Sequence, residues 1–400
     1  MFQDEAPSRS RVSPPVHYDP FDDHIQQDPY PTYRWLRDEA PLYRNDRLDF
    51  WTLSRFDDVL AAAHDPERFS SVDAVLLGER SEAMPPTMIT MDPPHHDELR
   101  RIVSRSFTPR AIGQLQARVR SIAAELLDGL DASSPVEMVE AFTVPLPVMV
   151  IADLLGVARQ DRAQFKEWSD IVVAMDPADQ TSLEASMAAG FELAGYFEQI
   201  AAARREAPQD DLVTLLVQAQ DADRLSYEEV LGFCLLLLIA GNETTTNLIG
   251  NALIVLAAHP DQRAEIAADR SLIPRAIEEV LRYDSPVQGL TRKTTTEVEL
   301  HGETLPVGAQ VMLLWASANR DEREYERPDE FHIHRDISRT VAFGHGIHYC
   351  LGAALARLEA RVAFEELLDR FPEWSIDRPV EWIRSGPVRG PERLHVDLGT

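Results

Sequence analysis

The sequence predicts a mainly α-helical fold with a small β region. Most of its 400 residues fall in segments whose apolar residues recur at helical spacing, and 44% of all residues are hydrophobic. Strand-like alternation is confined to a few short segments. We find no internal repeat and no linker long enough to divide the chain. We therefore expect one domain over residues 21–400, preceded by a flexible, Pro-rich arm at residues 1–20.

The helical pattern is clearest in the middle of the chain. Tyr227–Ala258 is predicted to form one long apolar helix, and Ile273–Tyr283 a second that ends before Ser285-Pro286. Other predicted helices are Leu99–Leu130 with a break at Thr108-Pro109, Pro145–Leu155, Gln164–Met175, Ser182–Arg205 and Leu351–Arg370. Predicted strands are Phe50–Leu53, Glu297–Leu300 and Gln310–Trp315, and predicted loops are Ser71–Thr87 and Asp321–Asp336.

Composition excludes several classes of function. A net charge of −28, from 39 basic and 67 acidic residues, disfavours nucleic acid and anionic membranes as partners. The start of the chain lacks the apolar core of a signal peptide, and the most apolar run, Val230–Gly241, has about 12 residues, too few to span a bilayer. Two cysteines, Cys234 and Cys350, fit a reducing compartment. We expect a cytoplasmic protein without a membrane anchor.

One cysteine lies in a glycine-rich run, Phe343-Gly-His-Gly-Ile-His-Tyr-Cys350-Leu-Gly352. Glycines let the backbone approach a large flat ligand, and they leave amide N–H groups free to point at a sulfur, which stabilises a thiolate. A thiolate held in this way is suited to be the axial ligand of a haem iron. The alternative is a structural cysteine in a turn. That alternative fits Cys234, which lies in an apolar run without such a set of spaced glycines and is predicted to lie in the core.

This run resembles the haem-binding loop of the cytochrome P-450 family, written F-G-x-G-x-H-x-C-x-G. Four more motifs match the family in order, and the resemblance extends from about Asp28 to the C-terminus. It implies the family's triangular helical prism and haem b as the cofactor. It also implies that Cys350 ligates the iron, with Phe343 and Gly344 of the loop against the haem.

A second motif, Ala240-Gly241-Asn242-Glu243-Thr244-Thr245, places an acid and a hydroxyl in the long apolar helix. Glycine inside a helix costs about 1 kcal/mol relative to Ala, which is understandable if a ligand approaches the backbone there. The Thr244 hydroxyl can bond a carbonyl one turn earlier. A polar patch where the helix reaches solvent is the alternative. The run resembles the family's acid–alcohol pair, which implies that Glu243 relays protons, Thr244 orients a water, and Ala240 and Gly241 lie against the haem.

A third motif, Glu279-Val-Leu-Arg282, has the i, i+3 spacing of a helical ion pair. By itself such a pair usually lies at the surface and contributes little. In the family it is buried with an arginine from a P-x-x-F-x-x-x-R stretch, here Pro328 to Arg335. The resemblance implies that Glu279, Arg282 and Arg335 brace the cysteine loop.

The remaining motifs concern the haem propionates. The run from Asp92 to Arg100 resembles the family's D-P-P-x-H-x-x-x-R, which implies that His96 and Arg100 hold one propionate. Arg292 and His348 match further propionate contacts. His95 is expected to face solvent. Thr340 departs from a histidine that the family often has at that position, and a hydroxyl there bonds a propionate only weakly.

The implied activity is that of a haem-thiolate monooxygenase. Such an enzyme inserts one atom of O₂ into a C–H bond or a double bond of an apolar small molecule and reduces the other atom to water. Residues expected to line the pocket are Ile239, Ala240, Val287 and Leu290, and those expected to roof it are Val75, Leu76, Leu77 and Met84. A fatty acid, terpene, steroid or polyketide-like substrate fits, and the sequence does not choose among them.

Electrons must then arrive from NAD(P)H through separate proteins, because the chain carries no reductase segment. Between Leu99 and Ala124 there are six arginines and no acid: Arg100, Arg101, Arg105, Arg110, Arg118 and Arg120. With Arg357 and Arg361 they form a basic patch suited to an acidic iron–sulfur ferredoxin served by a ferredoxin reductase. The alternative is that these arginines only balance nearby acids.

Three other functions remain open. A peroxygenase of the same fold uses hydrogen peroxide and does not need the acid–alcohol pair. An oxidative-coupling enzyme of the same fold differs only in its substrate. A haem sensor that carries out no catalysis has no use for that pair.

Overall fold

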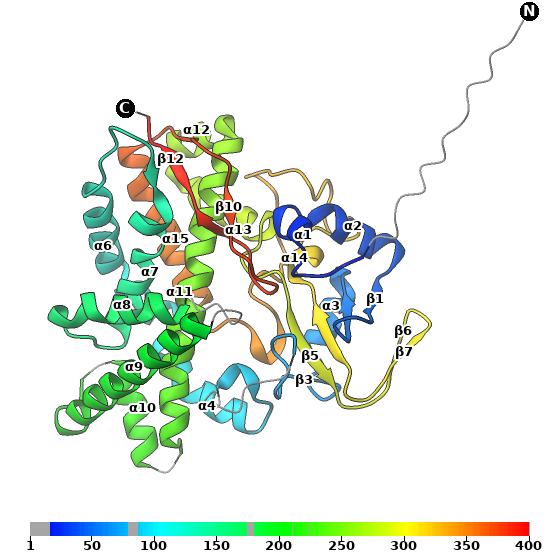
Figure 1. Cartoon of the computed structure of the whole chain (residues 1–400). Helices are drawn as coiled ribbons and strands as arrows, with labels where there is room; N and C mark the ends of the chain where they lie inside the picture. Colours follow the sequence, from blue (N-terminus) through cyan, green and yellow to red (C-terminus); the bar gives the residue numbers. More distant parts are fainter. Residues whose placement is uncertain (1–16, 79–86, 174–179, 210, 223, 400) are drawn as a thin grey trace, which may run out of the picture.

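The computed structural model describes residues 17–78, 87–173, 180–209, 211–222 and 224–399. Figure 1 shows a helix-rich part beside a smaller part built around a β-sheet, with helix α11 (Tyr227–Ala258) running through the helical part. The mainly α fold with a small β region is therefore confirmed. The division of the chain into an arm and one domain stays a prediction.

Helices that surround α11 make up most of the fold. Those before it are α4 (His95–Val103), α5 (Pro109–Gln114), α6 (Gln116–Asp128), α7 (Pro145–Leu154), α8 (Arg162–Val173), α9 (Gln180–Glu206) and α10 (Leu212–Asp221). Those after it are α12 (Pro260–Ala268), α13 (Ile273–Tyr283), α14 (Trp315–Ala318) and α15 (Ala353–Arg370). Near the N-terminus lie α1 (Asp23–Gln27), α2 (Tyr30–Glu39) and α3 (Phe56–Ala63).

The main sheet has five strands in the order β1–β2–β8–β5–β3. These are β1 (Leu42–Asn45), β2 (Phe50–Leu53), β3 (Phe69–Ser70), β5 (Leu290–Thr294) and β8 (Gln310–Leu313), and only β2 and β8 run parallel. The smaller sheets pair β6 (Val298–Leu300) with β7 (Glu303–Leu305), β10 (Glu381–Trp382) with β11 (Pro391–Arg393), and β12 (His395–Asp397) with β4 (Val136–Glu137) and β9 (Ser375–Ile376).

Strand alternation explains why the main sheet has a helix on each face. Val311 and Leu313 of β8 belong to a cluster with Phe56 of α3, whereas Met312 belongs to another cluster with Tyr33 of α2. Successive strand residues point to opposite faces, so each face buries its own apolar set. The sheet is thereby fixed between α2 and α3, and β5 next to β8 is held in place.

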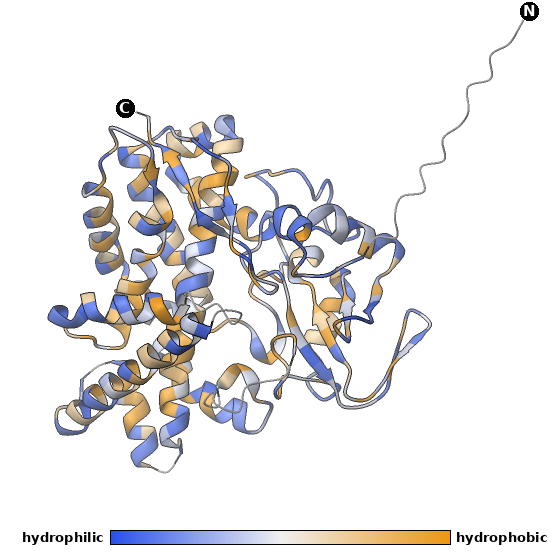
Figure 2. Ribbon diagram, viewed as in Figure 1, coloured by the Kyte–Doolittle hydropathy of each residue, from blue (hydrophilic) through white to orange (hydrophobic). Residues whose placement is uncertain are grey.

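α11 begins at a capping box. The Ser226 side chain accepts from the Glu229 amide at 3.2 Å, and the Glu229 carboxylate accepts from the Ser226 amide at 2.7 Å. Figure 2 shows that the half of α11 that follows this cap is mostly apolar. By length and composition α11 could cross a membrane, but 61% of its most apolar window is buried inside the protein. This burial is typical of a core helix.

Several predicted boundaries agree with the structure and some do not. α11 and α13 begin and end where the sequence predicts, and Thr108 caps α5 at the predicted break. The predicted strand at Gln310–Trp315 is two residues too long, because the Ala318 amide donates to the Leu314 carbonyl at 3.0 Å and α14 starts at Trp315. Part of one predicted helix, residues 174 and 175, lies outside the described residues. Helices α10 and α12 and strand β5 were not predicted.

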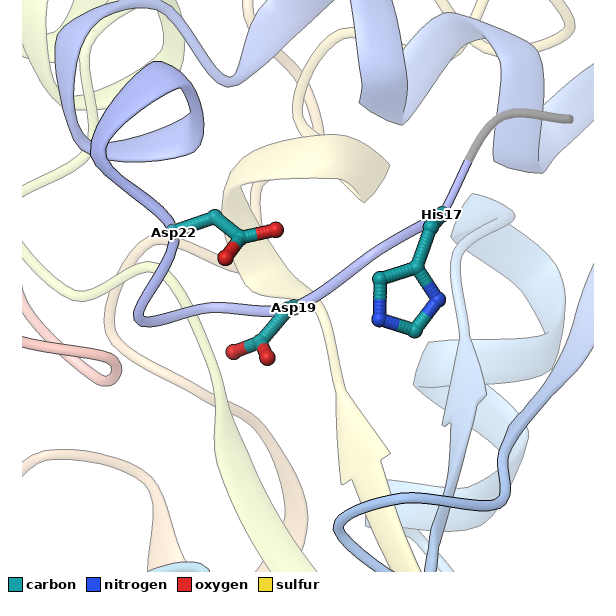
Figure 3. A group of neighbouring side chains, drawn as sticks. All are labelled: His17, Asp19 and Asp22. Atoms are coloured by element: carbon teal, nitrogen blue, oxygen red, sulfur yellow. The ribbon is translucent and has the colours of Figure 1, made fainter. Parts of the chain in front are cut away.

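The prediction of a loose arm is wrong for residues 17–20. Tyr18 and Asp19 are fully buried, because Tyr18 packs among aromatic rings in the cluster on the α2 side of the sheet and Asp19 pairs with Arg47. Figure 3 shows Asp19 with His17 and Asp22, whose ligand atoms lie within 4.8 Å of one another. Since Arg47 already neutralises Asp19, this cluster anchors the chain and gives no ground for a metal site. Residues 1–16 lie outside the described part.

Candidate active site

The cysteine loop is shaped by two glycines with positive φ. Gly344 has φ +65° and Gly346 φ +71°, a region that favours glycine. A Cβ on Gly346 would also lie 2.2 Å from the Ala63 carbonyl at the end of α3. The Cys350 amide donates to the Phe343 carbonyl at 2.9 Å and closes the loop. Close packing against α3 therefore requires the glycine spacing that the sequence displays.

The Cys350 sulfur lies at the start of α15. Burial raises the pKa of its thiol, while backbone N–H groups of Gly352 and Ala353 and the charges of Arg100 and Arg357 oppose this rise. The net direction is upward, so the amides alone do not produce the thiolate that the sequence predicts. Many protein atoms surround the side chain, yet the residue is exposed to solvent, so a ligand can reach it. Coordination to a metal ion deprotonates a thiol outright.

Cys234 is unsuited to this role. It is buried in the main core on α11, and burial raises the pKa of its thiol to about 12. The prediction that it is a core side chain is confirmed.

Basic side chains from three elements gather beside the cysteine loop. The rings of His96 on α4 and His348 in the loop are 4.4 Å apart between centroids. Arg292 comes from β5, and only 5% of its side chain is exposed. Burial, then the charges of Arg292, His96 and Arg100, lower the pKa of His348 to about 3. Burial lowers the pKa of Arg292 to about 10 against the opposing charge of Asp92.

Several of these basic groups lack a partner among the described residues. The Nε2 atoms of His96 and His348 are buried without a hydrogen bond, and the Arg292 guanidinium donates only to the neighbouring Thr291 carbonyl, at 2.8 Å. Buried donors without acceptors are rare in proteins. An anionic ligand with carboxylates satisfies them, and Arg100, which donates to the Tyr349 carbonyl at 2.6 Å, links the set to the cysteine loop. The donor set therefore fits the propionates and iron of a haem.

The acid and the alcohol on α11 differ in their surroundings. Thr244 Oγ1 donates to the Ala240 carbonyl at 2.7 Å, the bond that the sequence predicts. Glu243 is half-buried and forms no hydrogen bond or ion pair with the described residues, and burial raises the pKa of its carboxyl. Ala240 is exposed in the middle of this otherwise buried helix, so α11 has an accessible surface at the level of the pair.

Gly241 has a different explanation from the predicted one. A Cβ on it would lie 2.9 Å from Cδ1 of Ile151 on α7. The close contact of α7 with α11 favours a glycine whether or not a ligand is near. Its contact with a haem stays a prediction.

The third motif forms a buried network. Both Glu279 and Arg282 are fully buried, and Arg282 donates to the Glu279 carboxylate at 2.7 and 2.8 Å. Arg335 donates to the same carboxylate at 3.1 Å. Remaining donors of Arg282 bond the Asn319 and Pro328 carbonyls at 3.0 and 2.8 Å. The spacing identified these three side chains, and the structure brings them together.

Asn319, which the sequence did not single out, connects this network to the cysteine loop. Its Oδ1 accepts from the Val341 amide at 3.0 Å and from the Thr340 hydroxyl at 3.2 Å. Thr340 thus bonds a protein side chain, and the weak propionate contact has no support. No motif marks Asn319, because its partners lie more than twenty residues away on either side.

Residues predicted to roof and line the pocket are only partly brought together. Thr291 ties the segment at Val75 to β5, since the Thr291 amide donates to the Val75 carbonyl at 2.9 Å, which places Val75 next to Leu290. Leu77 instead packs on the cluster beside α2, and Leu76 is exposed, so neither is shown at a pocket. Met84 lies outside the described residues. The lining role of Ile239 stays a prediction.

A neighbour of the predicted pocket comes from the C-terminal region. Val287 forms an isolated bridge with Val388, and the Gln288 amide donates to the Pro387 carbonyl at 2.7 Å. His95 is exposed, as predicted, and contacts Glu229 at the start of α11. The contact at Val388 was missed because an isolated bridge outside the strands has no periodic pattern in the sequence.

Comparison with known proteins identifies the family. The cytochrome P-450 family model matches residues 52–382. The vitamin D(3) 25-hydroxylase of Pseudonocardia autotrophica is 43% identical over 394 residues, covering 96% of each chain. The cyclomarin C epoxidase of Salinispora arenicola is 41% identical, covering 91% of this chain and 95% of its own.

Solved structures agree. A cytochrome P-450 from Chondromyces apiculatus matches with a TM-score of 0.87 and 42% identity, covering 95% of this chain and 97% of its own. A Bacillus megaterium cytochrome P-450 in complex with testosterone matches with a TM-score of 0.84 and 37% identity, covering 94% and 99%.

The fold and the site define a haem-thiolate oxidoreductase. The chain belongs to the cytochrome P-450 family and is a monooxygenase of the bacterial type. The family implies haem and O₂, redox partners and apolar substrates.

Proposed function

We propose that this protein is a monooxygenase that hydroxylates or epoxidises an apolar small molecule, with Cys350 as the axial ligand of haem b. The observation that carries this proposal is the pairing of an accessible cysteine with a group of buried, unpartnered donors. When bound, the haem supplies the activation of O₂, and a thiolate ligand favours O–O cleavage. The protein's own side chains bind the haem, hold the cysteine loop and move protons.

Four residues hold the propionates: His96, Arg100, Arg292 and His348. Nδ1 of His96 lies 2.9 Å from the Asp97 carboxylate, and Nε2 is free. Nε2 of His96 is therefore available to donate to a propionate oxygen. Glu279, Arg282 and Arg335 hold the loop from which Cys350 projects.

Glu243 and Thr244 manage protons. The raised pKa of Glu243 brings it closer to neutral pH, where a carboxyl can both take up and release a proton. Thr244 can orient a water because its own proton is committed to the Ala240 carbonyl, which leaves the hydroxyl oxygen as an acceptor. This pair favours the monooxygenase over a peroxygenase or a haem sensor. An oxidative-coupling reaction would use the same residues.

We infer a rigid, steroid-like substrate from among the classes that the sequence left open. Two relatives support this choice: one is named as a vitamin D(3) hydroxylase, and one was crystallised with testosterone. The apolar side chains of Ile239, Val287 and Leu290 suit such a skeleton.

Electrons from NAD(P)H come through a ferredoxin reductase and an acidic ferredoxin that docks on the cysteine side. The basic patch is smaller than the sequence predicted. Arg118 pairs with Asp153, Arg120 contacts Glu365 and Glu366, Arg357 pairs with Glu278 and Arg361 with Glu365. For these four, the alternative of balancing nearby acids holds.

The arginines that stay available lie on α4, α5 and the turn between them. Arg101, Arg105 and Arg110 are exposed, and Arg105 and Arg110 form no ion pair among the described residues. A groove of about 350 Å³ begins at Pro109, the residue before Arg110, and its lining also includes Ile112, Leu358, Arg357 and Arg361. Charged groups around an apolar depression suit a transient protein contact. We place the ferredoxin here, and the protein in the cytoplasm.

The first prediction concerns the ligand. The reduced protein with carbon monoxide should give the strongly red-shifted Soret band of thiolate-ligated haem. Cys350→His should lose that band, because imidazole replaces the thiolate, whereas Cys234→Ser should keep it. A thiolate spectrum in Cys350→His would refute the assignment.

The second prediction concerns Thr244. With a steroid that gives a spectral binding shift, Thr244→Ala should bind it nearly as well as wild type but form less product per NAD(P)H consumed, because electrons are diverted to peroxide. Thr244→Ser keeps the hydroxyl and should largely restore the ratio. An unchanged ratio in Thr244→Ala, with turnover supported by peroxide alone, would favour the peroxygenase alternative.

The third prediction concerns ferredoxin. At low salt Arg105→Gln should slow reduction several-fold, while Arg118→Gln, which removes an equal charge from an arginine already paired, should have little effect. Stopped-flow reduction at increasing salt measures both. Equal rates in the two variants, or rates that do not change with salt, would rule out this docking face.

A further inference from the structure

One acidic side chain, Asp92, stands beside the basic group that faces the proposed haem. It lies three residues before α4, and its carbonyl accepts from the His96 amide at 3.1 Å, so it is bonded to the first turn of the helix that carries His96 and Arg100. Its carboxylate accepts from the Ser70 hydroxyl at 2.5 Å and from the Ser71 amide at 3.0 Å. Asp92 therefore fixes the start of α4 to the end of β3.

The same residue acts on Arg292. Ser70 of β3 is the register partner of Lys293 on β5, the residue next to Arg292. Hydrogen bonds thus run from Asp92 through β3 to the strand that carries Arg292. Asp92 also acts on Arg292 through its charge, and it is the acid that opposes the effect of burial on this guanidinium. Asp92 is thus linked to Arg292 in two ways, by hydrogen bonds through β3 and by its charge.

We propose that Asp92 is a positioning residue, which aligns α4 with β5. Its negative charge also partly offsets the positive charge that Arg292 presents to a haem propionate. This inference rests on the proposed role of Arg292 and His96 as propionate donors. Asp92 would thereby influence the reduction potential of the haem, although it is not proposed to contact the iron or the substrate.

The charge of Asp92 should shift the haem reduction potential in one direction only. Ferrous haem carries one positive charge less than ferric haem, so a nearby negative charge stabilises the ferric state. Removing the charge of Asp92 should therefore favour reduction and move the potential upward. Loss of alignment alone predicts weaker haem binding and no fixed sign for the potential. Groups behind the direct contacts of a cofactor typically affect its binding by about ten- to a hundredfold.

Asp92→Asn separates the two contributions. Asparagine can still accept from the Ser71 amide and bond Ser70, so the fold is kept while the charge is lost. We expect haem release to apomyoglobin at close to the wild-type rate and a reduction potential more positive than wild type. Asp92→Ala loses the bonds as well, and we expect about tenfold faster haem release.

Glu98→Gln is the matched control. Glu98 is on α4, is partly exposed, and its carboxylate lies 3.9 Å from the Arg101 guanidinium. This variant therefore removes the same charge at a residue that, unlike Asp92, does not act on Arg292. Its potential should stay at the wild-type value. An unchanged or lower potential in Asp92→Asn, or an equal upward shift in Glu98→Gln, would overturn the proposal. A wild-type protein without a thiolate spectrum would instead overturn the proposed function.

Discussion

The buried ion pair of Glu279 with Arg282 is the interaction on which the position of the cysteine loop depends. Both side chains are fully buried, and the carboxylate also receives Arg335 and the His332 amide at 2.9 Å. Removing one partner would leave a buried charge without compensation, at a cost of about 3–5 kcal/mol. Arg282 also donates to the backbone carbonyl of Asn319, and the side chain of Asn319 accepts from the Val341 amide. Val341 lies nine positions before Cys350 in the loop.

The opposite side of the site is arranged by charge. His96, His348, Arg100 and Arg292 bring basic groups from α4, the loop and β5 to one place in a strongly acidic protein. Buried donors without acceptors are costly until an anionic ligand is bound. Burial likewise raises the pKa of the Cys350 thiol. Haem binding would relieve both conditions, because the propionates meet the cations and the iron takes the thiolate.

Local patterns were enough to predict much of this account. α11 and α13 follow from periodicity, and the Glu279–Arg282 contact follows from helical spacing. The predictions that were wrong or incomplete concern contacts between segments that are distant in the sequence. Arg118 and Arg120 form a basic run in the sequence, yet Asp153 and Glu366 neutralise them in the fold. Gly241 is explained by Ile151 of another helix, and Asn319 by partners on two segments.

In this account, the buried network of Glu279 and Arg282 positions the cysteine loop through Asn319. Hydrogen exchange of individual amides in the haem-loaded protein tests it most directly, with Asn319→Leu compared to wild type. The side-chain acceptor is lost, so we predict faster exchange at Val341 and Cys350 and unchanged exchange at Val396 in the β12–β4 pair. Wild-type exchange rates at both loop amides in the folded variant would contradict the account.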